Sequence, residues 1–178
     1  MRIETQNIVI RGFTRKDAER FYAIAREASV YRHVPDWADG RFHPRDYYEM
    51  LDGFQKQSDN TDFSNGRCYA ITLQNDDEMI GMIGVGLKEL LNEVEIGYFM
   101  SENFQRNGYM REAVTALAEW CFKVSDLKYI ILTINCANDS SNKLAEKCGA
   151  ILHEKRTPIT HDKSYMDADS YFYYRIYK

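Results

Sequence analysis

The sequence predicts a mixed α/β (α+β) domain with a mostly antiparallel sheet. Two strands of this sheet are expected to splay apart beside a central helix. The main observation is a β-prone run, residues 94–100, that passes through a polar turn into an amphipathic helix ending near residue 122. The isoleucine-rich run 129–134 follows that helix, so we expect it to lie parallel to the strand before it. With the hairpins and helices predicted in the rest of the chain, the total is about seven strands and about four helices. The 178 residues suit one domain, residues 1–178.

The N-terminal third predicts one strand and two helices. Residues 8–10 form a β-prone run, and Thr14 is a good N-cap for the helix that follows. The pattern breaks over residues 31–42, which we predict to be a loop that carries exposed aromatic residues. Pro44 suits the first position of a second helix, which extends to residue 54.

The rest of the chain predicts an antiparallel meander, the central helix and a further short helix. Asn138 and the three residues after it offer several N-caps for the short helix, which ends at Gly149. The remaining predicted strands are residues 68–73, 79–87, 92–100, 129–134, 150–152 and 171–177.

The turn before the central helix has the character of an anion site. The first backbone N–H groups of a helix lack internal partners and carry the positive end of its dipole. Ala113, Leu117 and Cys121 recur at a four-residue spacing, which predicts one buried face. An ordinary strand–helix connection has the same pattern. Geometry alone therefore leaves open whether this turn binds an anion or only connects the strand to the helix.

Composition limits the function classes. The net charge of -4 argues against general nucleic-acid affinity and favours a cationic partner such as an amine. The four cysteines show no C-x-x-C pair, so we expect reduced thiols and a cytoplasmic protein. Neither a signal peptide nor an apolar run of about 18 residues occurs, so we expect no membrane association.

Three motifs occur in a fixed order along the chain. Together they resemble the GNAT superfamily of acetyl-CoA-dependent N-acetyltransferases, and most closely the branch that includes the ribosomal-protein N-terminal acetyltransferases. With the N-terminal and C-terminal strands, the resemblance covers essentially the whole chain. The motifs are Glu95-Ile96-Gly97-Tyr98, Gln105-x-x-Gly108-Tyr109-x-x-Glu112-Ala113 and Asn138-x-x-Ser141-x-Lys143-x-x-Glu146-Lys147-x-Gly149.

The resemblance implies a GNAT-like domain that uses acetyl-CoA as co-substrate. In this family the turn before the central helix binds the CoA pyrophosphate through backbone N–H groups, and the pantetheine arm lies between the splayed strands. Asn138 matches a family asparagine that contacts the cofactor, and Ser141 and Lys143 lie on the same helix. The cofactor-binding residues implied are Gly97, Tyr98, Phe99, Met100, Gln105, Arg106, Asn107, Gly108, Tyr109, Met110, Arg111, Asn138, Ser141 and Lys143.

Three positions depart from the family pattern. Met110 stands where glycine or alanine is usual, and we expect it to narrow the pyrophosphate loop. Ala150 replaces a usual phenylalanine after Gly149, which we interpret as a packing change. Ala145 occupies the position of a tyrosine that many members use to protonate the leaving thiolate, so the general acid stays unassigned.

Acetyl transfer to an amine needs a neutral nucleophile, a polarised carbonyl and a route for the proton. Glu95 is the candidate base through a water, although a surface carboxylate is the alternative. Ser141 is the candidate to protonate or hydrogen-bond the thiolate, and helix capping is its alternative. His33 and Trp37 lie in the loop expected to face the acceptor, where Trp37 either recognises substrate or fills the core.

Two functional hypotheses follow. The first is an N-acetyltransferase that acts by direct attack on the thioester, with a protein N-terminus, a polyamine or another small amine as acceptor. The second is a non-catalytic module that binds acyl-CoA. The histidines lack metal-ligand spacing, so we expect no metal. The tyrosine-rich strand at residues 171–177 either pairs across a homodimer or lies inside the sheet.

Overall fold

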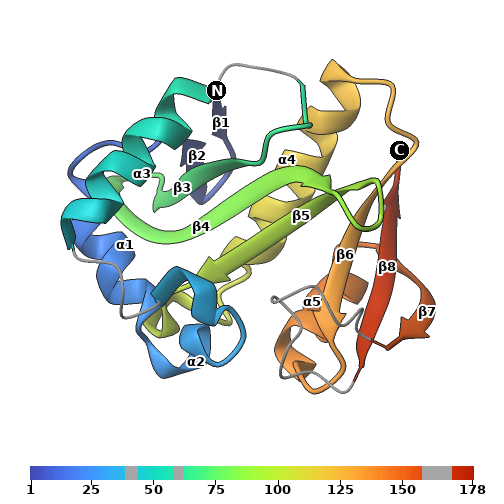
Figure 1. Cartoon of the computed structure of the whole chain (residues 1–178). Helices are drawn as coiled ribbons and strands as arrows, with labels where there is room; N and C mark the ends of the chain where they lie inside the picture. Colours follow the sequence, from blue (N-terminus) through green and yellow to red (C-terminus); the bar gives the residue numbers. More distant parts are fainter. Residues whose placement is uncertain (39–43, 58–61, 158–169) are drawn as a thin grey trace.

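Eight strands form one sheet in the order β1-β2-β3-β4-β5-β6-β8-β7 in the computed structural model (Figure 1). The structure describes residues 1–38, 44–57, 62–157 and 170–178. Neighbouring strands are antiparallel except β5 and β6, which are parallel, as the connecting helix predicts. The strands are β1 (Arg2–Glu4), β2 (Ile8–Arg11), β3 (Arg67–Leu73), β4 (Asp76–Lys88), β5 (Glu93–Met100), β6 (Tyr129–Asn135), β7 (Ile151–Arg156) and β8 (Tyr171–Tyr177).

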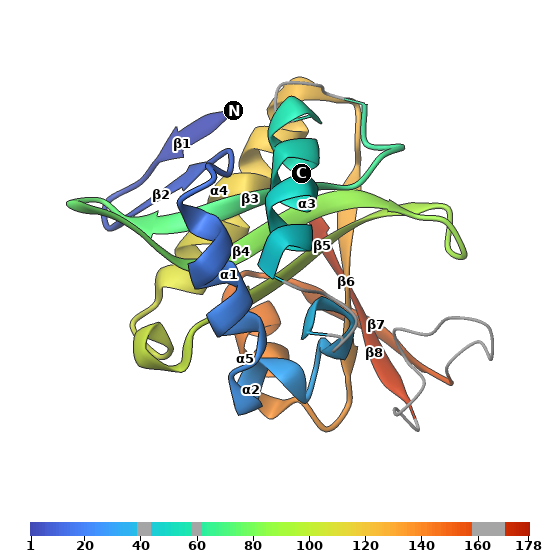
Figure 2. The same ribbon diagram turned by 60° about the vertical axis from the view of Figure 1, so that its left-hand side comes forward.

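Helices cover both faces of this sheet. They are α1 (Asp17–Ala25), α2 (Ala28–Tyr31), α3 (Pro44–Gln57), α4 (Tyr109–Val124) and α5 (Asp139–Lys147), with short 3-10 turns η1 (Pro35–Ala38) and η2 (Glu102–Phe104). Figure 1 and Figure 2 together show α4 and α5 against one face and α1, α2 and α3 toward the other. In the described part of the chain, no helix is both long and apolar enough to cross a membrane.

The central helix α4 buries the face that its sequence predicts. Ala113, Leu117 and Cys121 are each 0% exposed. They pack against inward-facing residues of the sheet, among them Ile83 and Ile130, in the largest hydrophobic cluster. The apolar stripe on α4 therefore forms the core on this face, because burial of such a stripe is the main stabilisation available to an amphipathic helix.

Two features of the N-terminal region differ from the prediction. The strand β1 was not predicted, because Arg2–Glu4 is too short to show alternation and becomes a strand only by pairing with β2. Thr14 was wrong as an N-cap: α1 begins at Asp17 after Lys16, and Thr14 instead donates its N–H and hydroxyl to the Asp17 carboxylate.

The loop predicted over residues 31–42 is partly helical. It contains the end of α2 and the turn η1, both too short for a periodic signal, while residues 39–43 lie outside the described residues. The tyrosine-rich strand β8 lies between β6 and β7, so both of its edges are paired. Pairing of this strand across a homodimer was therefore the wrong alternative.

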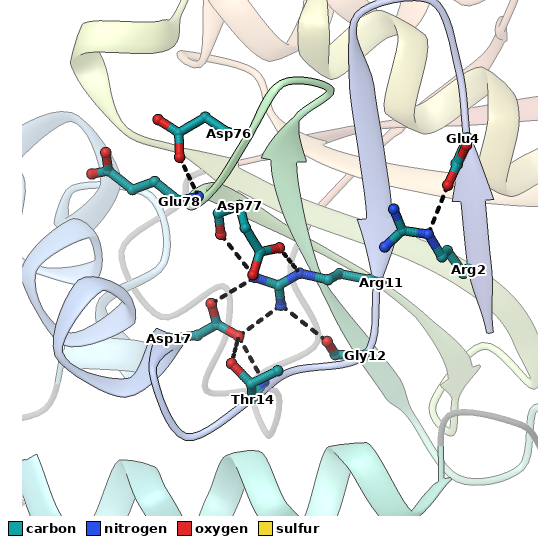
Figure 3. Close-up of polar contacts among 9 residues, drawn as sticks. All are labelled: Arg2, Glu4, Arg11, Gly12, Thr14, Asp17, Asp76, Asp77 and Glu78. Carbon is teal, nitrogen blue, oxygen red and sulfur yellow. Dashed lines mark hydrogen bonds and ion pairs between the residues drawn. The ribbon is translucent and has the colours of Figure 1, made fainter.

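A buried arginine joins three segments near the N-terminus (Figure 3). The guanidinium of Arg11 donates to both carboxylate oxygens of Asp17, at 2.8 and 3.0 Å. Its Nε donates to the Asp77 carboxylate at 2.7 Å, so β2, α1 and the start of β4 are connected. Arg11 is 8% exposed and Asp17 is 3% exposed, so removal of either partner leaves a buried charge without its main compensation.

Asp17→Ala is expected to lower the free energy of unfolding by about 3 kcal/mol. Removal of one partner of a buried ion pair usually costs about 3–5 kcal/mol. We expect the lower end of this range because Asp77 still compensates part of the Arg11 charge. The Arg2–Glu4 pair is the control: its side chains are 57% and 54% exposed, so Glu4→Ala is expected to cost less than about 1 kcal/mol. Urea unfolding followed by fluorescence measures both, and equal losses would contradict the assignment.

Candidate active site

β5 and β6 meet at one point and then diverge. Their parallel register contains a single pair, Glu95 with Ile131. Figure 1 shows the two strands separating from there toward their C-terminal ends. The β6-facing edge of residues 96–100 thus has no strand partner among the described residues, which confirms the predicted opening. Free N–H and C=O groups on a strand edge pair readily with an extended ligand.

The turn before α4 presents free backbone N–H groups. Gly108, the N-cap, has a φ of 84°, and Arg106 has a φ of 66°. No side chain caps the first turn of α4. Left-handed residues beside a helix N-terminus arrange their N–H groups around a concave anion site. A Cβ on Gly108 would meet nothing within 4 Å, so the backbone conformation, and not crowding, favours glycine there.

Two polar side chains shape this turn. The Asn107 amide donates to the carbonyl oxygens of Phe104 and Gln105, at 3.3 and 3.2 Å. The Gln105 amide donates to the carbonyl of Met100 at 3.0 Å. Both amides are therefore used within the protein, which leaves backbone N–H groups as the main ligands of this stretch.

The other predicted residues of this stretch differ in exposure. Arg106 and Arg111 are exposed beside the turn, and Tyr109 is half-buried. Met110 is 9% exposed and packs in the core against α4 and the sheet. Its side chain therefore does not narrow the turn, contrary to the expectation from the sequence, because the first helical turn directs it inward.

Acidic residues connect the turn to its surroundings. The Glu112 carboxylate accepts the backbone N–H and the side-chain amide of Asn7, at 2.8 and 3.0 Å. Glu102 accepts the N–H of Ser29 at 3.0 Å, and Glu27 accepts the N–H of Glu102 at 2.6 Å. These last two bonds are reciprocal caps between α2 and η2. The sequence did not predict them, because the partners lie far apart along the chain.

The short helix α5 begins at the predicted asparagine. Asn138 is 9% exposed, and its side-chain oxygen accepts the N–H of Ser141 at 3.2 Å and the hydroxyl of Ser140 at 2.9 Å. Ser141 is half-buried in the first turn, Lys143 is exposed, and Ala145 is fully buried. Asn138 thus has a structural role as the N-cap of α5.

A cavity of about 230 Å³ lies on the side of β5 opposite α4. Apolar side chains dominate its wall, and its charged lining residues are Arg67, Lys88 and Glu95. Trp37 lines the cavity and also packs edge-on against Phe21, with ring centroids 5.7 Å apart, so it fills part of the core at the cavity wall. Gly97 also lines it, and a Cβ there would meet nothing within 4 Å.

Glu95 is enclosed by polar groups from two neighbouring strands. The Thr133 hydroxyl of β6 donates to one carboxylate oxygen. The Lys88 ammonium of β4 lies 3.6 Å from the other, and the Glu95 side chain is 20% exposed. Burial raises the pKa of Glu95 above its ordinary value, while Lys88 and Thr133 oppose that rise. A carboxylate with a raised pKa beside a cavity suits proton transfer near neutral pH.

The structure brings together only part of the predicted site. Glu95 and Trp37 line the same cavity, whereas His33 is half-buried and does not line it. Burial, with a smaller contribution from Arg32, lowers the pKa of His33. Sequence reasoning missed Thr133 and Lys88. Thr133 is the one threonine in an isoleucine-rich strand, which was the available signal.

The residues present fit an acetyl-CoA molecule on four observations. The first turn of α4 is uncapped and β5 has an unpaired edge, which suit a pyrophosphate and an extended amide chain. The open space at Gly97 and Gly108 leaves room for a ligand. The Tyr98 hydroxyl is buried without a hydrogen-bond partner in the described residues.

Comparison with known proteins also points to an acetyltransferase. Residues 7–151 match the acetyltransferase (GNAT) domain family. The uncharacterised N-acetyltransferase YnaD of Bacillus subtilis is 28% identical over 149 residues, 84% of this chain and 82% of YnaD. The ribosomal-protein-serine acetyltransferase of Escherichia coli is 33% identical over 78 residues, 43% of this chain and 44% of that enzyme.

Solved structures share the fold. A GNAT-family acetyltransferase from Bacillus anthracis has a TM-score of 0.79 at 22% identity, covering 99% of this chain and 98% of the other. RimL, a ribosomal L7/L12 acetyltransferase in complex with coenzyme A, has a TM-score of 0.79 at 17% identity, with the same coverage. The family match spans most of the sequence, and the splayed sheet agrees with it. This chain is a member of the GNAT acetyltransferase family.

Proposed function

We propose that this protein transfers the acetyl group of acetyl-CoA to a primary amine by direct attack of the amine on the thioester. The observation that carries the proposal is the opening between β5 and β6. The uncapped first turn of α4 lies beside this opening. On the side of β5 that faces away from α4 lies a cavity whose wall includes Glu95. The two substrates would therefore approach from opposite sides and meet at the point where the strands separate.

The cofactor would bind along the turn and the open strand edge. The N–H groups of residues 106–111 would hold the pyrophosphate, with Arg106 and Arg111 adding positive charge. The backbone of residues 97–100 would pair with the pantetheine amides, and Ser141 and Lys143 would contact the cofactor from α5. When bound, acetyl-CoA supplies an activated acetyl group on sulfur.

Glu95 is the proposed base. Its carboxylate lies in the cavity wall between Lys88 and Thr133, where it would take the amine proton through a water. The amine nitrogen forms the new bond to the acetyl carbon, the carbon–sulfur bond breaks, and sulfur keeps the electron pair. We propose no covalent enzyme intermediate.

The acceptor belongs to one of three classes: a protein N-terminus, a polyamine or another small amine. The similarity to a ribosomal-protein-serine acetyltransferase supports the first class. The residues expected to select it include the ranges 39–43 and 158–169, which lie outside the described residues. Free thiols at all four cysteines agree with a cytoplasmic location, which we also propose.

Titration calorimetry with acetyl-CoA, followed by assay of free CoA release with an amine panel, tests the proposal. The panel contains peptides with free N-termini, spermidine and simple primary amines. We expect binding and amine-dependent release of CoA. Binding without release from any amine would support a non-catalytic acyl-CoA-binding module instead, and no binding to the folded protein would refute both.

A further inference from the structure

The Tyr98 hydroxyl is a buried hydrogen-bond donor without an acceptor. Tyr98 lies on β5 just beyond the point where β5 leaves β6, and its hydroxyl forms no hydrogen bond within the described part of the chain. Leaving a buried hydroxyl unpaired is destabilising, so such groups need an explanation in a folded protein. A ligand that accepts this hydrogen bond is one such explanation.

The surroundings of the hydroxyl belong to α5 and β8. Ser141, in the first turn of α5, lies beside it without hydrogen-bond geometry, and Cys148 and Tyr174 are also near. Tyr174 provides a contrast, because its hydroxyl donates to Asn142 of α5 at 3.2 Å. Of these two buried tyrosine hydroxyls, only that of Tyr98 has a donor left for a ligand.

Tyr98 therefore lies on the opposite side of β5 from Glu95. Successive side chains of a strand point to opposite faces, so the side chains of Glu95 and Phe99 lie on the cavity side of β5 and the Tyr98 hydroxyl lies on the α5 side, although Tyr98 also contributes to the cavity wall. Burial raises the pKa of Tyr98 well above its ordinary value. The group stays protonated at any working pH and so acts as a donor.

We propose that the Tyr98 hydroxyl donates a hydrogen bond to the coenzyme A sulfur and stabilises the negative charge that develops there during acetyl transfer. The inference rests on the proposed function, and it fills the role left open by Ala145. The carbon–sulfur bond breaks with its electron pair on sulfur, Tyr98 keeps its proton, and the departing thiolate is protonated by solvent.

The test compares coenzyme A with desulfo-coenzyme A, which lacks only the sulfur, by calorimetry at pH 7 and pH 9. A larger share of the thiol is ionised at pH 9. In the wild type we expect the preference for coenzyme A to rise about five- to tenfold between the two pH values, since hydrogen bonds to charged groups are the stronger ones. In Tyr98→Phe we expect the preference for coenzyme A over desulfo-coenzyme A to be the same at both pH values. We also expect kcat with acetyl-CoA to fall about tenfold or more.

Tyr174→Phe is the matched control. It removes a buried hydroxyl that has a partner, so we expect a lower unfolding midpoint and an unchanged preference for coenzyme A. Tyr98→Phe removes an unpaired hydroxyl, so its midpoint is expected to be equal to or above that of the wild type.

The outcomes separate this inference from the proposed function. A wild-type preference that does not change with pH, or one that survives in Tyr98→Phe, overturns the role of Tyr98 even when turnover is normal. A preference that rises with pH and is lost in Tyr98→Phe, in a protein that acetylates no amine, supports the hydrogen bond and refutes the transferase.

Discussion

Replacement of Gly108 by tryptophan is expected to abolish measurable acetyl-CoA binding while the protein stays folded. Gly108 has a φ of 84°, and a Cβ there would meet nothing within 4 Å. The substitution therefore costs about 1–2 kcal/mol of backbone strain, while its Cβ enters open space. The indole would instead occupy the space in front of the first N–H groups of α4, where we place the pyrophosphate.

Gly149→Trp is the control for the backbone effect. Gly149 has a φ of 77° and equally open space, but it follows the C-terminal end of α5. Both variants should lose similar stability, while only Gly108→Trp loses binding by at least about a hundredfold, which corresponds to roughly 2.7 kcal/mol. Gly108→Ala should fall between the wild type and Gly108→Trp. Calorimetric titration measures these affinities, and normal binding to Gly108→Trp would place the cofactor elsewhere.

Local signals made the helix starts around the proposed cofactor site predictable. Gly108 marks the start of α4, Asn138 marks the start of α5, and the apolar period of α4 gives its buried face. Each of these depends on residues close together in sequence, which is where capping and periodicity act. Met110 was the exception, because its direction depends on how α4 packs against the sheet and not on the motif.

The cavity that we propose for the acceptor depends on strand register, which the sequence does not reveal. Alternation along β5 predicts that Glu95 and Gly97 share a face, but nothing local pairs Glu95 with Thr133 of β6 or Lys88 of β4. The reciprocal bonds of Glu27 and Glu102 are likewise visible only once α2 lies beside η2. Long-range pairs of this kind come from the topology, so sequence reasoning named Glu95 as the candidate base but did not find the residues that contact it.

Glu95→Gln is expected to lower kcat/KM about 10²- to 10⁴-fold, the usual contribution of a general base. Glutamine has nearly the same size and can still accept the hydrogen bond from Thr133, so acetyl-CoA affinity and stability should change little. Steady-state kinetics with one acceptor measures the loss of kcat/KM, and calorimetry measures the affinity for acetyl-CoA. Full activity in Glu95→Gln would exclude this carboxylate as the base.

Lys88→Met should move the pH profile in a defined direction. A base acts when deprotonated, so the rate rises with pH through the pKa of Glu95, which burial places above the ordinary value of 4.5. Lys88 lowers that pKa by its positive charge. Its removal is therefore expected to shift the acidic limb of kcat/KM to higher pH relative to the wild type with the same acceptor.

Glu93→Gln tests whether any carboxylate on this face of β5 gives the same result. Burial raises the pKa of Glu93, but hydrogen bonds from the hydroxyls of Tyr173 and Tyr129, together with Arg175, outweigh burial and lower the pKa overall. Glu93 is thus ionised throughout the working range and does not line the cavity. Its loss should leave the acidic limb in place, because only a carboxylate that titrates beside the acceptor can set that limb. Loss of a negative charge lowers the pKa of a neighbouring carboxyl, so a shift of the limb to lower pH, as large as the upward shift in Lys88→Met, would mean that long-range charge, and not contact with Glu95, controls the profile.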